Sequence, residues 1–207
     1  MKICAISPFS NASKKEMLTF ISTLNHDLIV LPGNGPNHPS CNLIQQCMQT
    51  NSRVFVEVGS GKFASKPWLV SKTSLIQMPD QIFAQTPRTG DIDALELAWP
   101  KRTFSISERV VSFAICGEID GFSKNGSVKY GRKLPFDVLI NPTHTIRGRW
   151  NHLGVKLSNL SIGTAVIHTA NNNKNKFNLT THLRLYVNGV ICTRQNTGKL
   201  TWSECQI

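Results

Sequence analysis

Among the six cysteines, one lies at a position in the sequence that is typical of a reactive residue. Cys116 ends the run of apolar and small residues over 110–115 and is followed at once by Gly117 and Glu118. A continuous apolar run that stops at a glycine turn is typical of a buried strand, so Cys116 is expected at the carboxyl end of a strand. In open α/β sheets, ligands bind beyond such strand ends. Cys116 is therefore a candidate nucleophile, and the plain alternative is a buried cysteine without a function.

A nucleophilic thiol needs a base, because a free thiol is mostly protonated near neutral pH. Three side chains are candidates. Glu118 follows Cys116 by two residues, Glu57 lies in an expected strand, and His38 lies in the loop 33–39, which is rich in glycine and proline. The spacing alone does not decide among them. His168 lies within an apolar strand pattern and is interpreted as a core or sheet-face histidine.

Composition limits the class of protein. The chain has 207 residues, 40% of them hydrophobic and 17% charged, which indicates a soluble globular domain with a sizeable core. No apolar run is long enough for a membrane span, and the amino terminus does not resemble a signal peptide, so a cytoplasmic protein is expected.

The net charge and the spacing of the cysteines indicate which partners, metals and cofactors to expect. A net charge of +11 permits binding to nucleic acid or another anionic partner, although the basic residues form short clusters that are typical of a solvated surface. The six cysteines show no CxxC or zinc-finger spacing. We therefore expect free thiols, no metal and no cofactor.

Hydrophobic periodicity predicts the elements that hold the candidate residues. Ser13-Lys-Lys-Glu16 is a capping box at the start of a helix. A β-α-β-α-β order up to residue 59 favours parallel strands with crossover helices, and hairpins follow. Prolines and Gly90 predict a loop over 79–102. The expected strands are 2–7, 27–32, 53–59, 68–70, 75–78, 103–106, 109–116, 135–142, 164–169, 182–187, 190–192 and 200–202, and the expected helices are 14–25, 40–48 and 147–160.

This order predicts a single α/β domain over residues 1–207, with two mixed β-sheets packed face to face and helices outside, an α-β-β-α sandwich. At this point the sequence resembles the nitrilase, or carbon-nitrogen hydrolase, superfamily. The resemblance rests on short blocks in the family's order: 2–6, 27–32, 70–75, 113–118, 136–142 with the helix after it, 166–171 and 185–190.

The resemblance implies a chemistry. In this family a cysteine attacks an amide or nitrile carbon, a glutamate is the general base, and a lysine stabilises the intermediate. Cys116 matches the nucleophile and Lys72 matches the lysine. Gly33 stands where the family has its glutamate, so Glu118, Glu57 or His38 would have to replace that base.

Two functions follow from these expectations. The first is a diverged amide-type hydrolase or acyltransferase with impaired or altered catalysis, acting on a small amide-like substrate. The alternative is a non-catalytic basic protein that binds an anionic partner such as nucleic acid. The resemblance also implies a homodimer, for which the segment 147–160 is the expected contact.

Overall fold

Strand β1 (Lys2–Pro8) is apolar on both faces in the computed structural model of the chain, which describes residues 1–35, 37–59, 65–144, 150–177 and 181–207. Successive side chains of a strand point to opposite faces. Ile3 and Ala5 accordingly enter one buried cluster, and Cys4 and Ile6 enter another. A strand buried on both faces belongs to the interior of a layered α/β fold.

Two mixed sheets contain the strands of the described residues. The first has seven strands in the order β12-β13-β1-β2-β3-β4-β5, and the second has six in the order β11-β10-β9-β8-β7-β6. The bounds in the first sheet are β2 (Leu28–Val30), β3 (Arg53–Val58), β4 (Lys66–Ser71), β5 (Leu75–Gln77), β12 (Arg194–Thr197) and β13 (Leu200–Gln206). Those in the second are β6 (Thr103–Ile106), β7 (Arg109–Phe113), β8 (Val138–Thr143), β9 (Ala165–Ala170), β10 (Leu183–Val187) and β11 (Val190–Ile191).

The centre of each sheet is parallel. Strands β1, β2 and β3 pair in parallel in one sheet, and β7, β8 and β9 do so in the other. Their inner faces share one apolar cluster, in which Phe55 of β3 stacks on Phe113 of β7 with ring centroids 5.1 Å apart. Loops that follow parallel strands emerge at the same edge of a sheet, so this edge is the place to look for a site.

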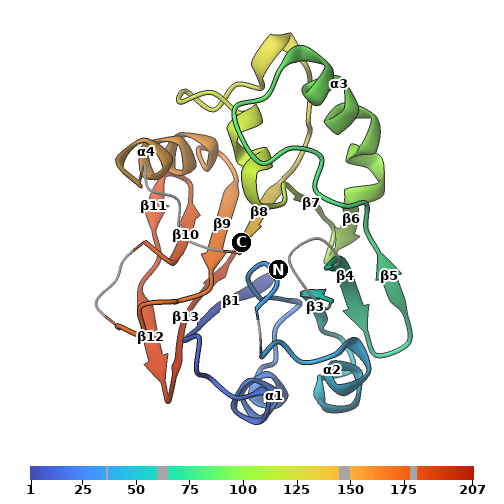
Figure 1. Ribbon diagram of the computed structural model, residues 1–207, viewed down its shortest axis with the longest axis vertical. Coiled ribbons are helices and arrows are strands. Elements are labelled where there is room, and N and C mark those ends of the chain that lie inside the picture. Colours follow the sequence, from blue (N-terminus) through green and yellow to red (C-terminus); the bar gives the residue numbers. More distant parts are fainter. Residues whose placement is uncertain (36, 60–64, 145–149, 178–180) are drawn as a thin grey trace.

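Helices cover the two outer faces, as Figure 1 shows. Helices α1 (Lys14–Thr23) and α2 (Cys41–Cys47) pack on the seven-stranded sheet. Helices α3 (Thr89–Ala98) and α4 (Trp150–Leu160) pack on the six-stranded sheet. Three short 3₁₀ helices complete the list for the described residues: η1 (Trp99–Arg102), η2 (Cys116–Gly121) and η3 (Lys129–Gly131). The expected α-β-β-α sandwich is confirmed.

Helix α3 corrects the prediction of a loop over 79–102. Pro87 and Pro100 lie just outside the helix and mark its two ends, where proline costs no hydrogen bond. Gly90 lies in the first turn and faces open space, and Asp91 accepts a hydrogen bond from the amide of Arg88 at 2.7 Å, which caps the helix start.

Two strands also differ from expectation. Strand β7 ends at Phe113, because the backbone turns into η2 at Cys116. The edge strand β12 was not predicted, since its residues are polar and mostly exposed. Residues 147–149 of the expected helix 147–160 lie outside the described part of the chain. No helix in the described residues is long and apolar enough to span a membrane.

Candidate active site

Cys116 lies on the turn after β7, where η2 begins, with a backbone φ of +47°. This left-handed conformation is unfavourable for a residue with a side chain, so neighbouring groups must hold it. The buried Glu118 carboxylate accepts from the amide of Ile115 at 2.8 Å and forms an ion pair with the buried Arg102. From β8, Asn141 Nδ2 donates to the carbonyl oxygen of Cys116 at 3.0 Å. The turn is therefore fixed from two directions.

His144 follows β8, the parallel neighbour of β7, and β7 leads into the turn that holds Cys116. Its Nε2 lies 2.9 Å from Glu57 Oε1, and the same ring hydrogen-bonds the Cys116 side chain. These two interactions outweigh burial and raise the pKa of His144 from 6.5 to about 10. At neutral pH the structure therefore favours an imidazolium between a sulfur and a carboxylate.

Glu57 is held on the inner face of the seven-stranded sheet. It lies two residues after Phe55, which packs between the sheets, and alternate residues of a strand share a face. The carboxylate also accepts from Ser65 Oγ at 2.5 Å and from the amide of Asn34 at 3.2 Å. Burial acts to raise the pKa of Glu57, but the hydrogen bonds and charge of His144, with these two donors, lower it. The carboxylate is thus ionised and aimed at His144.

Gly33 makes room for the backbone of His144. Its amide donates to the Thr143 carbonyl at 3.0 Å, which joins the end of β2 to the end of β8 across the two sheets. A Cβ at position 33 would lie 2.7 Å from the His144 nitrogen and 2.8 Å from the Thr143 carbonyl carbon. Backbone atoms cannot yield as a flexible side chain can, so position 33 has no room for a side chain unless the backbone at 143 and 144 moves.

Asn171 ties the loops that carry these residues. Its Nδ2 donates to the carbonyl oxygens of Gly33 at 2.8 Å and of His144 at 3.0 Å. Its Oδ1 lies 3.2 Å from Nε2 of His38. Burial lowers the pKa of His38 to about 4, so this imidazole is neutral near pH 7. His38 therefore supports Asn171 and does not face the thiol as a charged group.

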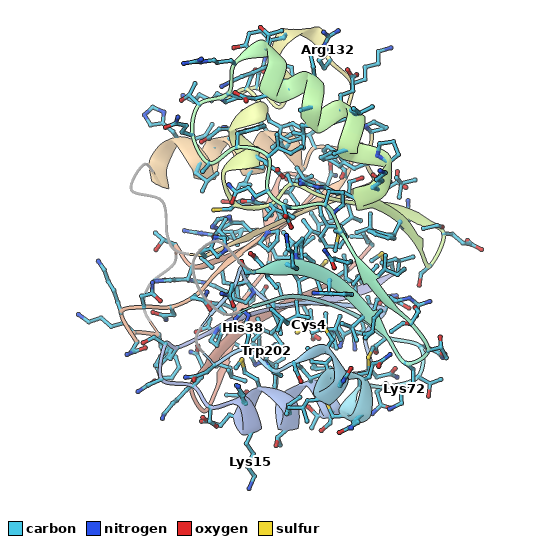
Figure 2. The ribbon with its side chains drawn as sticks, turned by 45° about the vertical axis from the view of Figure 1, so that its right-hand side comes forward. Cys4, Lys15, His38, Lys72, Arg132 and Trp202 are labelled. Carbon is cyan, nitrogen blue, oxygen red and sulfur yellow. The ribbon has the colours of Figure 1, made fainter. Side chains whose placement is uncertain are left out.

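Lys72 lies at the opposite end of the sheet from Glu57. In the antiparallel pair β3–β4, Ser71 pairs with Arg53 at the start of β3, four residues before Glu57. Four residues of strand span about 13 Å. The Lys72 ammonium donates to two main-chain carbonyls at the end of α2, both at 3.1 Å, and Figure 2 shows Lys72 at the lower margin of the molecule. The expected role of Lys72 beside Cys116 does not fit this placement.

The structure separates the three candidate bases. Glu118 is buried and faces Arg102, the amide of Ile82 and the amide of Ile115, so the expected role of Glu118 as a base does not fit its contacts. Glu57 reaches the site through the imidazole of a fourth residue, His144, which was not predicted from the sequence. The sequence marked His144 only by its position. It follows β8, which is the neighbour of β7 in the sheet, so His144 and Cys116 lie at the same sheet edge.

Two further expectations concern His168 and metals. His168 is fully buried, with Nδ1 2.8 Å from Asn141 Oδ1, so it is a core histidine that orients the side chain beneath Cys116. Among the described residues, no group of three or more His, Cys, Asp or Glu side chains is arranged to hold a metal ion.

Comparison with solved structures places this fold. The chain superimposes on XC1258 from Xanthomonas campestris, a CN-hydrolase superfamily protein with an arsenic adduct in its active site, with a TM-score of 0.56 and 9% identity, covering 100% of this chain and 90% of the other. Nit3 of Saccharomyces cerevisiae, a nitrilase superfamily member, gives a TM-score of 0.52 at 10% identity over 98% of this chain and 89% of its own.

An amidase from Nesterenkonia is similar to the same extent. A glutamate-to-glutamine mutant of that amidase, with the acetamide moiety of fluoroacetamide added covalently at the active-site cysteine, gives a TM-score of 0.55 at 10% identity, covering 99% of this chain and 90% of that one. No protein-family model and no curated protein sequence matches the chain. The chain therefore has the nitrilase-like fold, as expected from its sequence.

Proposed function

We propose that this chain is a diverged member of the nitrilase superfamily, a cysteine-dependent hydrolase or acyltransferase of amide-type carbon-nitrogen bonds. One observation carries the proposal: the His144 imidazole hydrogen-bonds both the Cys116 side chain and the Glu57 carboxylate. A nucleophile, a base and a group that orients the base are the parts that nucleophilic catalysis needs. The fold shared with solved amidases supports an amide-like substrate.

Each of the three residues has a separate role in the two steps of the reaction. The Cys116 thiolate attacks the carbonyl carbon of an amide, and the C–N bond breaks as the His144 imidazolium gives its proton to the leaving nitrogen. The acyl group remains on sulfur as a thioester. Water, or an acceptor amine, then attacks the thioester while neutral His144 takes the proton, and the acid or new amide leaves. Glu57 keeps the ring oriented and stabilises its positive charge.

His144 also replaces two groups of the resembling family. It supplies the base that Gly33 cannot supply, and its imidazolium supplies the positive charge beside the sulfur that was expected from Lys72. A cation close to the reacting carbonyl stabilises the oxyanion that forms in the transition state. The altered catalysis expected from the sequence is, in this proposal, an exchange of base.

The direct test is amide turnover. Purified protein is incubated with a panel of short aliphatic, aromatic and peptide amides, ammonia release is measured, and hydroxylamine is added to trap the thioester as a hydroxamate. We expect release with the unaltered protein, a loss of about 10²–10⁴-fold with His144→Gln, and none with Cys116→Ala. Cys41→Ser, which removes a half-buried thiol on α2, serves as the matched control.

A covalent probe complements the assay. Fluoroacetamide should leave its acetamide group on Cys116, detected by peptide mass spectrometry. The proposal is wrong if the unaltered protein releases no more ammonia than Cys116→Ala across the panel and fluoroacetamide labels Cys116 no faster than Cys41.

A second candidate function rests on charge. The net charge of +11 favours an anionic partner such as nucleic acid, through contacts that weaken with salt. The other motive for a non-catalytic protein, the glycine at position 33, is weakened because His144 occupies that region. Mobility-shift titrations with single- and double-stranded DNA and RNA at two salt concentrations test this candidate, and absence of binding at low salt removes it.

The homodimer stays a prediction. Val155 on α4 and Ile162 just after it are 43% and 68% exposed, which gives this face apolar side chains for a partner copy. Static light scattering measures the state directly, and a monomer at every accessible concentration would contradict it.

A further inference from the structure

Two cysteines face each other far from the candidate active site. Cys192 lies in the connection between β11 and β12, where the chain crosses from one sheet to the other, and Cys205 lies in β13. Strands β12 and β13 pair with Arg194 opposite Ser203 and Thr197 opposite Leu200. Extending this antiparallel register by two residues would set Cys192 opposite Cys205, while the Cys192 amide still donates to the Leu185 carbonyl of β10 at 2.8 Å.

Local contacts keep the chain in this register beyond the end of the ladder. Ser203 Oγ donates to the carbonyl of Thr193 at 2.8 Å. Directly opposite residues in antiparallel strands have Cα atoms about 4.5–5.5 Å apart, which lies within the range that a disulfide spans. A hydrogen bond between the two side chains is among the causes that shift the pKa values of Cys192 and Cys205, which agrees with their placement as neighbours.

The two thiols are not equivalent. The Cys205 hydrogen bond lowers the pKa of Cys192, and the same hydrogen bond and burial raise the pKa of Cys205. Both side chains are half-buried and pack on the cluster between the sheets. Cys192 is thus the more acidic of the two thiols, and Cys205 is the neighbour that can attack the Cys192 sulfur once it is modified.

We propose that Cys192 and Cys205 are a redox-active dithiol that forms an intramolecular disulfide by exchange with a small-molecule disulfide such as glutathione disulfide. The Cys192 thiolate attacks one sulfur of the reagent, which forms a mixed disulfide and expels one glutathione thiolate. Cys205 loses its proton and attacks the Cys192 sulfur, which expels the second. The two protein thiols are oxidised by two electrons, and the reagent is reduced to two glutathione molecules.

The position of the pair separates this site from the proposed catalytic one. Cys205 pairs with Ile3 near the start of β1, whereas Cys116, His144 and Glu57 lie at or beyond the carboxyl ends of their strands. Figure 1 shows β13 running antiparallel beside β1 on the side of the sheet away from β3. The disulfide would join the crossing segment to β13, and so close the two sheets covalently at one side.

The test is exchange in glutathione buffers. The full-length protein is incubated with reduced and oxidised glutathione, quenched with acid, alkylated and mapped by mass spectrometry. We expect a peptide linked through Cys192 and Cys205, formed at least about tenfold faster than glutathione addition at Cys41, since burial raises the pKa of Cys41. In Cys205→Ser, Cys192 should remain as the mixed disulfide with glutathione. In Cys192→Ser, Cys205 should form neither a disulfide nor a mixed disulfide with glutathione.

Two results would overturn the proposal. One is an unaltered protein in which Cys192 accumulates as a lasting mixed disulfide, since Cys205 would then not resolve it. The other is a Cys192 that reacts no faster than Cys41. Neither bears on amide turnover, because Cys116 is read from a separate peptide and by ammonia release, so failure here is distinguishable from failure of the proposed function.

Discussion

Replacing His144 by glutamine should slow the alkylation of Cys116 by iodoacetamide at pH 6 by about 10- to 30-fold. Glutamine keeps a polar side chain of similar length but carries no positive charge. Because the pKa of His144 is raised to about 10, the unaltered ring is protonated at pH 6. A cation in hydrogen-bond contact with a sulfur favours the thiolate, which is the form that alkylates.

The size of the effect follows from two opposing quantities. An ordinary thiol is only about 0.3% thiolate at pH 6, so pairing with an imidazolium raises the thiolate fraction by up to about 300-fold. A less basic thiolate is also a weaker nucleophile, by roughly tenfold over such a range. The net advantage of the unaltered protein is therefore about 30-fold at most, and it should shrink towards pH 10, where the ring loses its proton.

The assay measures each cysteine separately. Brief alkylation at several pH values, followed by peptide mass spectrometry, gives the rate at Cys116 beside those at Cys41 and Cys47. Burial raises the pKa values of these two thiols, so they are slow internal references. His152→Gln is the matched control, because His152 is exposed on α4.

One outcome would refute the reasoning. If Cys116 alkylates at the same rate at pH 6 in the unaltered protein and in His144→Gln, while both have the same melting temperature, His144 does not activate the thiol. The proposed division of the reaction would then fail with it.

Three further predictions concern the groups that support the site. Gly33→Ala should destabilise the protein by about 1–3 kcal/mol and slow Cys116 alkylation, because the new methyl group overlaps the backbone of His144; equal melting temperatures would contradict this. His38 is buried and neutral, with a pKa lowered from 6.5 to about 4, so the folded protein loses stability as the pH falls through this window. In urea titrations, His38→Gln should remove roughly 3 kcal/mol of the pH dependence of the unfolding free energy between pH 6.5 and 4. An unchanged pH profile would count against this assignment. Glu118→Gln should lower the free energy of unfolding by about 3–5 kcal/mol by leaving Arg102 buried without its partner, and a loss below about 1 kcal/mol would show that the pair is not buried as described.

The sequence predicts the layers of this fold because its strands are short, apolar and regularly spaced. The capping box at Ser13 and Glu16 forms as expected, and the central strands fall where the apolar runs lie. Helix α3 was not predicted, because Pro87 and Pro100 lie just outside its two ends and were interpreted as breaks within a loop. Strand β12 escapes because edge strands can be polar, so that no apolar pattern marks them.

The site was predictable only in part. The end of an apolar run made Cys116 a candidate, which the order of the blocks around it strengthened, and Glu57 shares the inner face with Phe55 by alternation. His144 has no motif of its own, and its contact with Glu57 joins residues 87 positions apart on different sheets. Lys72 matched a short pattern of spacing, but the register of β4 against β3 carries it to the far end of the sheet.

The close packing of Gly33 on His144 also limits how this site can change by mutation. A glutamate at position 33 requires the backbone at 143 and 144 to move, and we expect that movement to disturb the contacts of the imidazole with Cys116 and Glu57. Under the proposed mechanism, a single substitution at 33 would therefore displace His144 before the new glutamate could act as the base. The arrangement with His144 and the arrangement with a glutamate at 33 would then be separated by an inactive intermediate, and no single mutation would convert one into the other.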